Sequence, residues 1–188
     1  MHMGWFRIGH SISGIRRNLR QLEYHIVKIL PASVDDAEAI SAIWNPVIAG
    51  TTVTFNNVEK SRTDVATMIK DRHTSGRAFL VAHQGDNLLG FATYGPFRSG
   101  SGYANTVEHT VILAEQAKGN GVGRALLTAL ESHAKANGIH SMIASVSAEN
   151  TIAVAFHKTL GFEQVAYIPE AGRKFGRWLD VVFLQKIL

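Results

Sequence analysis

The chain has 188 residues, of which 46% are hydrophobic and 18% charged, with a formal net charge of +4 and no cysteine. These values are typical of one soluble globular domain with a sizeable core. The lack of cysteine excludes disulfides, thiol catalysis and cysteine-based metal sites. No apolar run reaches the roughly 18 residues that a membrane helix needs, so we expect a cytoplasmic protein without a membrane partner.

Residues 1–25 are expected to form a basic, weakly ordered extension ahead of a domain that spans residues 26–188. Arginines recur in this extension, and no acidic residue precedes Glu23. A targeting or membrane-surface helix would carry this pattern, and so would a loose extension. There is no long apolar segment or small-residue cleavage site, which argues against secretion.

The first half of the domain reads as one strand and two helices. A short strand over 25–30 ends at Pro31, and the pair Ser33 and Asp36 resembles a capping box. The apolar spacing from Ala37 to Val47 predicts a helix that Pro46 should bend or end. After a loop over 49–57, a second cap at Ser61 opens another helix.

The middle of the chain reads as three strands, over 77–83, 88–94 and 106–113. The loop between the second and third contains three glycines and one proline within residues 95–103. Loops of this kind often carry binding groups.

A glycine-dense turn, 118–124, then opens an amphipathic helix that ends at Asn137-Gly138. A strand over 141–146 and a helix over 148–160 follow, and strands over 162–167 and 179–184 form a closing antiparallel pair. Between the last two lies a basic and aromatic segment, 172–178.

The glycine turn predicts an anion site beside a candidate base. A helix N-terminus presents free N–H groups and a partial positive charge, and glycines let an anion approach the backbone. The turn matches neither a dinucleotide fingerprint nor a P-loop. A purely structural turn remains the alternative.

Glu108 is the candidate general base, because a carboxylate can take a proton from an amine that must be neutral to attack. Alternation places Glu108 and Thr110 on one face of the strand and His109 on the other. His109 is expected in the core, and it is the competitor for the base role. A solvated or ion-paired Glu108 is the plain alternative.

The element order and the turn Lys118-Gly119-Asn120-Gly121-Val122-Gly123 resemble the GNAT superfamily of acetyl-CoA-dependent N-acetyltransferases. Lysine replaces the usual Arg or Gln at the first position of that loop. Over about residues 27–186 the chain is most similar to the phosphinothricin and methionine sulfoximine acetyltransferase group. The strings that carry this resemblance include Trp44-Asn45-Pro46, Thr52-Val53-Thr54-Phe55, Tyr94-Gly95-Pro96-Phe97-Arg98, Thr106-Val107-Glu108-His109, Ala148-Glu149-Asn150, His157 through Phe162 and Gly172 through Asp180.

The resemblance implies a single α/β (α+β) domain. Its central twisted, mixed but mostly antiparallel sheet would have about six or seven strands, flanked by about four helices. It also implies acetyl-CoA as cosubstrate and a homodimer. The pyrophosphate would bind N–H groups of Gly119 to Arg124, with added charge from Lys118 and Arg124. N–H groups of Val111, Ile112 and Leu113 would stabilise the oxyanion, and Asn150 would bind the pantetheine arm or merely cap a helix.

The same resemblance assigns the catalytic and substrate residues. Glu108 would be the base, acting directly or through water. His157 lies where many GNAT enzymes place a tyrosine that protonates the departing thiolate, although an ordinary helix histidine explains it equally. Around an amino acid-like substrate the resemblance places Phe55, Arg98, Gly102, Tyr103 and Lys174, with Trp178 nearby and a possible dimer contact.

The expected activity is therefore acetylation of a small primary amine by direct attack, since no cysteine or serine-elbow nucleophile is present. Another acceptor, such as an antibiotic, a polyamine or a protein N-terminus, is the first alternative. A non-catalytic acyl-CoA-binding module is the second. Paired metal-ligand spacing is absent from the sequence, as is a basic run interleaved with aromatics inside the domain, so we expect neither metal nor nucleic acid.

Overall fold

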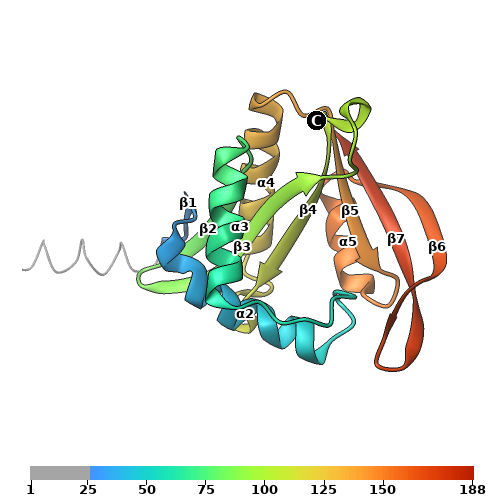
Figure 1. Cartoon of the computed structure of the whole chain (residues 1–188), viewed down its shortest axis with the longest axis horizontal. Helices are drawn as coiled ribbons and strands as arrows, with labels where there is room; N and C mark the ends of the chain where they lie inside the picture. Colours follow the sequence, from blue (N-terminus) through green and yellow to red (C-terminus); the bar gives the residue numbers. More distant parts are fainter. Residues whose placement is uncertain (1–25) are drawn as a thin grey trace, which may run out of the picture.

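A computed structural model describes residues 26–188 and shows one seven-stranded sheet covered by helices on both faces (Figure 1). The order of strands and long helices along the chain is the one that the sequence predicts. The predicted basic extension, residues 1–25, lies outside the described residues.

The sheet has the strand order β1-β2-β3-β4-β5-β7-β6, and all neighbours are antiparallel except β4 and β5. This confirms the mixed, mostly antiparallel sheet. The strands are β1 Lys28–Pro31, β2 Phe79–Gln84, β3 Asn87–Pro96, β4 Thr106–Leu113, β5 Ser141–Ser147, β6 Glu163–Lys174 and β7 Arg177–Ile187.

Two helices cover each face of the sheet. Helices α2 (Ala37–Gly50) and α3 (Arg62–Thr74) pack on one face, and α4 (Val122–Ala136) and α5 (Thr151–Thr159) pack on the other. Three single turns complete the elements: η1 Val34–Asp36, η2 Ser101–Tyr103 and η3 Glu115–Ala117. Within residues 26–188, no helix is long and apolar enough to cross a membrane.

The helix starts follow the predicted caps. Ser33 and Ser61 each form a reciprocal capping box with the aspartate three residues on, which satisfies two of the N–H groups that a helix start leaves free. Helix α2 does not end at Pro46 but continues to Gly50. Asn45 supports this stretch, because its side chain exchanges two hydrogen bonds with the backbone of Lys60.

Strands β6 and β7 are much longer than the predicted pair and form a hairpin whose tip is Phe175-Gly176. The pairing register shifts twice along β6, and Glu170 has a positive φ of 50°. Each irregularity interrupts the period of two by which a strand is recognised in a sequence. The length of the hairpin was therefore hidden from the alternation pattern.

Candidate active site

Strands β4 and β5 are paired over only a short stretch and then separate. Their parallel register runs from Thr106 opposite Ser141 to Glu108 opposite Ile143, although both strands continue beyond it. Figure 1 shows the two strands diverging at the centre of the sheet. The backbone of β4 beyond Glu108 is therefore open on its β5 side.

The direction of the free N–H groups follows from the ladder with β3. The N–H of Ala114 donates to Leu89, and the carbonyl of Thr106 accepts from Phe97, both across the β3–β4 pair. Because N–H groups in an antiparallel strand alternate between its two sides, the even-numbered residues of β4 bond to β3. Val111 and Leu113 therefore direct their N–H groups into the opening.

Ile112 was predicted as a third donor, and the structure corrects this. Its N–H belongs to the ladder with β3, opposite Phe91, and its side chain is buried in the core under α2 and α3. The candidate oxyanion donors are reduced to Val111 and Leu113.

The glycine turn forms the predicted helix N-terminus. Gly119 and Gly121 have φ angles of 77° and 79°, a region that side chains with a Cβ rarely adopt. The first intrahelical bond of α4 runs from Ala125 to the carbonyl of Gly121, so the N–H groups of Val122, Gly123 and Arg124 have no partner within the helix. This end of the helix therefore has the free N–H groups and the partial positive charge that favour an anion.

Gly123 brings this anion site against the open part of β4. A Cβ at this position would lie 3.3 Å from the side chain of Leu113 and 3.4 Å from that of Phe156, so side chains of β4 and α5 pack directly on the backbone at the start of α4. Lys118 forms an ion pair with Glu115 at 2.6 Å, and Arg124 donates to the Thr159 hydroxyl at 3.2 Å. Both cations stay at the surface beside the turn.

Glu108 lies at the point where β4 and β5 separate. Its side chain is partly buried and projects toward the face that carries α2 and α3, as Ile112 of the same strand does. It forms no hydrogen bond or ion pair with any residue in 26–188. A partly buried carboxylate without a protein partner is available to a substrate.

His109 and His157 lie on the other face and form a buried aromatic pair. Their ring centroids are 5.1 Å apart, and both rings contact Phe162. Burial lowers the pKa of His109 to about 3, with a smaller contribution from His157. His109 is therefore a neutral core residue, as expected, and lies away from Glu108.

His157 is also buried, and burial lowers its pKa. Its Nδ1 lies 2.7 Å from the Ala153 carbonyl, so the neutral ring carries its proton at Nδ1 and donates it there, and Nε2 has no partner among the described residues. A neutral histidine whose only proton is held by a backbone carbonyl is poorly suited to protonate a thiolate. This environment corresponds to the ordinary helix histidine.

Asn150 caps α5, since its Oδ1 accepts from the N–H of Ala153 at 3.1 Å. The cap uses the side-chain oxygen and leaves the amide NH₂ group available as a donor. The geometry is therefore compatible both with a helix cap and with an Asn150 that binds the pantetheine arm.

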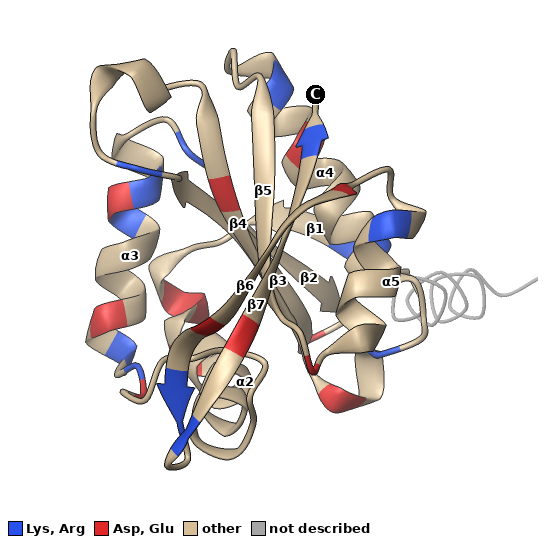
Figure 2. Cartoon of the chain, turned by 90° about the vertical axis from the view of Figure 1, so that its right-hand side faces the viewer, with Lys and Arg blue, Asp and Glu red and all other residues tan. Residues whose placement is uncertain are grey.

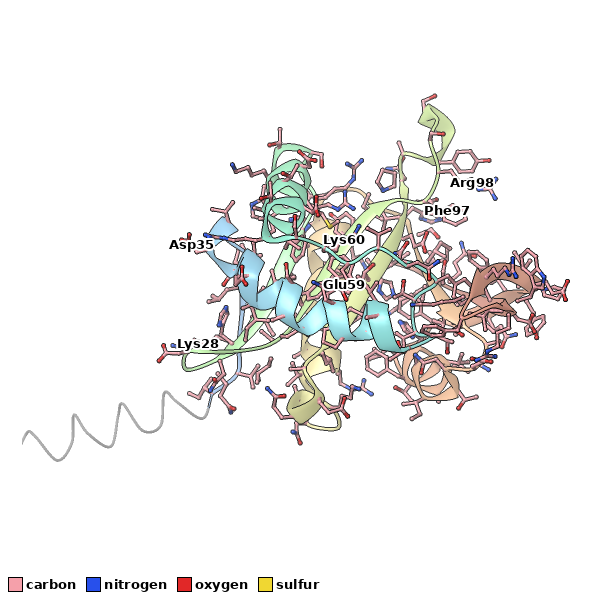
Figure 3. The ribbon with its side chains drawn as sticks, turned by 60° about the horizontal axis from the view of Figure 1, so that its bottom comes forward. Lys28, Asp35, Glu59, Lys60, Phe97 and Arg98 are labelled. Carbon is pink, nitrogen blue, oxygen red and sulfur yellow. The ribbon has the colours of Figure 1, made fainter. Side chains whose placement is uncertain are left out.

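The residues predicted to bind the substrate do not form one cluster. Arg98 and Tyr103 are exposed on the β3–β4 connection, and Arg98 lies over the ring of Phe97 at 5.4 Å (Figure 3). Gly102 is in the short turn η2. Phe55 lies against Gly172 of β6, so closely that a Cβ there would overlap its ring.

Lys174 is not free to bind a substrate, which corrects that prediction. Its side chain is 3% exposed, and its Nζ donates to the carbonyls of Ile48 and Thr54 at 2.6 and 2.7 Å. Lys174 thus joins β6 to the end of α2 and the loop after it. At this residue the basic segment 172–178 therefore packs against the domain.

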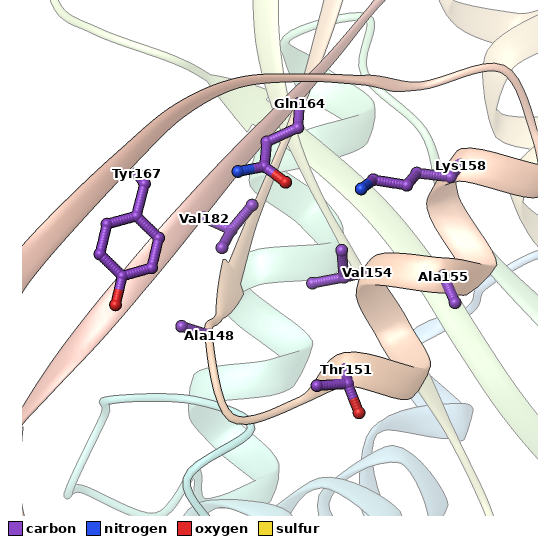
Figure 4. A pocket seen from close by; sticks show the side chains of 8 residues that line it. All are labelled: Ala148, Thr151, Val154, Ala155, Lys158, Gln164, Tyr167 and Val182. Carbon is purple, nitrogen blue, oxygen red and sulfur yellow. The ribbon is translucent and has the colours of Figure 1, made fainter.

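The sequence missed Arg72, whose partly buried guanidinium lies against Gly95 beside Glu108. Helix periodicity places Arg72 on the face of α3 that carries the buried Val65 and Ile69, but no motif marks it as a ligand. A surface hollow of about 430 Å³ lies elsewhere, between α5 and strands β6 and β7 (Figure 4). None of the predicted site residues lines it.

Among residues 26–188, no three His, Asp or Glu side chains are arranged to hold a metal ion.

Comparison with known proteins gives a consistent family. Residues 29–183 match the acetyltransferase (GNAT) domain. An L-methionine sulfoximine/L-methionine sulfone acetyltransferase of Pseudomonas aeruginosa is 37% identical over 158 residues, which are 84% of this chain and 92% of that protein. A phosphinothricin N-acetyltransferase of Alcaligenes faecalis is 34% identical over 155 residues, 82% and 79% of the two chains.

A solved structure has the same fold. It is a GNAT superfamily phosphinothricin acetyltransferase from Sinorhizobium meliloti in complex with acetyl-CoA, with a TM-score of 0.82 and 29% identity over 86% of this chain and 88% of that one. The family match and the relatives indicate the same family. The chain belongs to the GNAT family of acetyltransferases.

Proposed function

We propose that this chain transfers the acetyl group of acetyl-CoA to the primary amine of a small amino acid-like substrate, of the phosphinothricin or methionine sulfoximine type. One observation carries the proposal: β4 holds an unpaired carboxylate at Glu108, then two open N–H groups, and ends beside the N-terminus of α4. The names of the relatives support the substrate class.

The residues around this strand fit acetyl-CoA. The N–H groups of Gly119 to Arg124, at the start of α4, suit a pyrophosphate, and Lys118 and Arg124 add positive charge nearby. The open edge of β4 offers donors to the pantetheine arm and to the thioester carbonyl, and the amide NH₂ group of Asn150 can serve the same arm.

Glu108 is proposed to remove a proton from the substrate ammonium, directly or through water. The neutral amine then attacks the thioester carbonyl carbon, and a C–N bond forms while the carbonyl oxygen becomes an oxyanion. The N–H groups of Val111 and Leu113 stabilise that charge without reorganising, because the strand already holds them in place. The attacking nitrogen loses its second proton to solvent, and collapse of the intermediate breaks the C–S bond and releases CoA as the thiolate.

A thiol-release assay with acetyl-CoA and a panel of amines, from pH 6 to 10, tests this proposal on the wild type and Glu108→Gln. The variant should lose activity near neutral pH and recover it at high pH, where the amine is neutral without a base. An unaltered pH profile would remove Glu108 from the base role. Binding of CoA without turnover of any amine would favour an acyl-CoA-binding module, and turnover of only polyamines or antibiotics would change the acceptor.

We also propose that two copies of the chain associate, through the outer strands of the sheet. The edge strand β6, its partner β7 and the hairpin tip between them expose apolar side chains, each 44–58% exposed: Val165, Tyr167, Ile168, Phe175 and Trp178. Such a surface is unusual on a monomer. Sedimentation equilibrium should give a dimer for the wild type and for Val58→Glu, an exposed loop position, and a monomer for Ile168→Glu.

A further inference from the structure

Arg72 is a partly buried cation without a protein partner. It lies in the last turn of α3, and its Nε is buried with no hydrogen-bond acceptor in the part of the chain that the structure describes. The guanidinium also forms no ion pair with residues 26–188. Burial and the nearby Arg77 lower the pKa of Arg72 and outweigh the opposite effect of Asp71, and a bound anion would offset both lowering effects.

Gly95 makes room for this guanidinium. A Cβ on Gly95 would lie 2.9 Å from Nη2 of Arg72 and 3.2 Å from its Cζ. Real Cβ atoms essentially never come this close, so a larger residue at position 95 would displace the end of the Arg72 side chain. The head group of Arg72 is therefore placed over β3 by the absence of a side chain.

The register of the sheet brings this cation next to Glu108. Gly95 and Glu108 are directly opposite in the β3–β4 ladder, and opposite residues project from the same face with Cβ positions about 5 Å apart. In Figure 2 the C-terminal end of α3 lies beside the sheet, level with the first half of β4. An unpaired guanidinium and an unpaired carboxylate are thus neighbours that do not bond to each other.

We infer that Arg72 and Glu108 form a recognition pair for the two charged groups of an α-amino acid, with Arg72 binding the carboxylate. The inference rests on the proposed function and names the feature of the substrate that this site selects. In an α-amino acid one carbon separates the ammonium from the carboxylate, which matches a guanidinium of α3 held over Gly95 of β3 and a carboxylate at the opposite position of β4. A planar guanidinium suits a carboxylate because it can donate two parallel hydrogen bonds.

Arg98, the arginine that the resemblance places around the substrate, has a different environment. It is exposed and lies over the ring of Phe97, where solvent screens its charge. Arg72 is partly buried, and its interaction with an anion is correspondingly stronger. The exposed arginine remains suited to the distal part of a substrate.

The test compares two substrates that differ only in the carboxylate. Initial rates of thiol release are measured with L-methionine sulfoximine and with its methyl ester, which keeps the amine but cannot accept a charged hydrogen bond pair. The wild type should prefer the free acid by about 10- to 100-fold in kcat/KM. The variants are Arg72→Gln, Arg72→Lys and Gly95→Ala, and the thermal midpoint of each verifies folding.

Arg72→Gln should lose that preference, through KM for the acid, while its kcat/KM for the ester stays within about threefold of the wild type. Arg72→Lys should retain part of the preference, because it keeps the charge without the planar fork. Gly95→Ala should act in the same direction as Arg72→Gln, since it displaces the guanidinium. Lys70→Gln removes an exposed charge from the same helix and should change neither substrate.

The outcomes separate this inference from the proposed function. Equal losses on acid and ester in Arg72→Gln would make Arg72 a structural residue and overturn the inference while acetylation stands. A wild type that uses acid and ester equally well would also overturn it alone. A wild type that acetylates neither compound would overturn the proposed function, and the inference with it.

Discussion

His109 of β4 and His157 of α5 lie ring against ring, 5.1 Å apart, where α5 packs on the sheet. Both nitrogens of His109 and Nε2 of His157 are buried without a hydrogen-bond partner among the described residues. Burial lowers the pKa of His157 and outweighs the hydrogen bond to the Ala153 carbonyl and the charge of Glu131 of α4, both of which raise it. Lys186 of β7 pairs with that glutamate at 2.6 Å. The pair is accommodated only while both rings are neutral.

The first prediction is a loss of stability in acid. Folding lowers the pKa of His109 from 6.5 to about 3, so below about pH 6.5 the unfolded chain binds a proton that the folded chain does not. The free energy of unfolding should be unaffected by this group above that pH and fall below it, by up to about 1.4 kcal/mol per pH unit. Urea unfolding from pH 4 to 8 measures it.

His109→Leu should flatten the acid limb, because the replacement is apolar, similar in volume and does not titrate. His140→Gln is the matched control, since His140 is exposed and its loss should leave the slope unchanged. If the slope survives in His109→Leu, the acid sensitivity comes from other groups.

The second prediction concerns the acid step of the reaction. Loss of a general acid typically costs about 100-fold in rate, whereas we expect His157→Gln to remain within about fivefold of the wild type in kcat at neutral pH. Its pH–rate profile should keep its shape and its thermal midpoint should fall, because a buried side chain has been replaced. Disappearance of one limb of the profile would instead return His157 to the acid role.

The third prediction concerns the glycine turn. At Gly121 the φ of 79° makes Gly121→Val cost about 1–2 kcal/mol of stability. The free N–H groups at the start of α4 should lose their alignment, with CoA affinity reduced by at least about 10-fold. Calorimetric titration with CoA measures the affinity.

Gly138→Val is a closely matched control for this change. Gly138 has a φ of 76°, and, as at Gly121, a Cβ there would meet no atom within 4 Å, but it follows the opposite end of α4. It should therefore cost similar stability and leave CoA binding intact. Equal affinities in the two variants would disprove the assignment of the turn.

The fourth prediction concerns Lys174. Lys174→Met keeps the aliphatic stem and leaves the carbonyls of Ile48 and Thr54 without their donor, which should destabilise the fold by about 2–4 kcal/mol. Arg173→Met, at an exposed neighbouring position, should stay within about 0.5 kcal/mol of the wild type. Urea unfolding compares them, and similar stabilities would show that the buried ammonium contributes nothing.

Local signals in the sequence were sufficient for most of the secondary structure. The capping boxes at Ser33 and Ser61, the alternation along 106–113 and the glycine turn each depend on residues a few positions apart, and the structure confirms them. The long β6–β7 hairpin was underestimated because register shifts break its alternation. Pro46 predicted a bend or an end of α2, but the helix continues to Gly50. Next to the proline, the side chain of Asn45 forms hydrogen bonds with Lys60, fifteen residues away.

The sequence by itself determined which residue types could perform the chemistry: a carboxylate on a β-strand and a glycine turn at a helix start. Only the tertiary structure decided which of them are available, because availability depends on partners distant in the sequence. Lys174 is held by carbonyls more than a hundred residues earlier in the chain, and His157 is enclosed by aromatic rings. Arg72 lies beside Glu108 only because a glycine on β3 leaves room for its guanidinium.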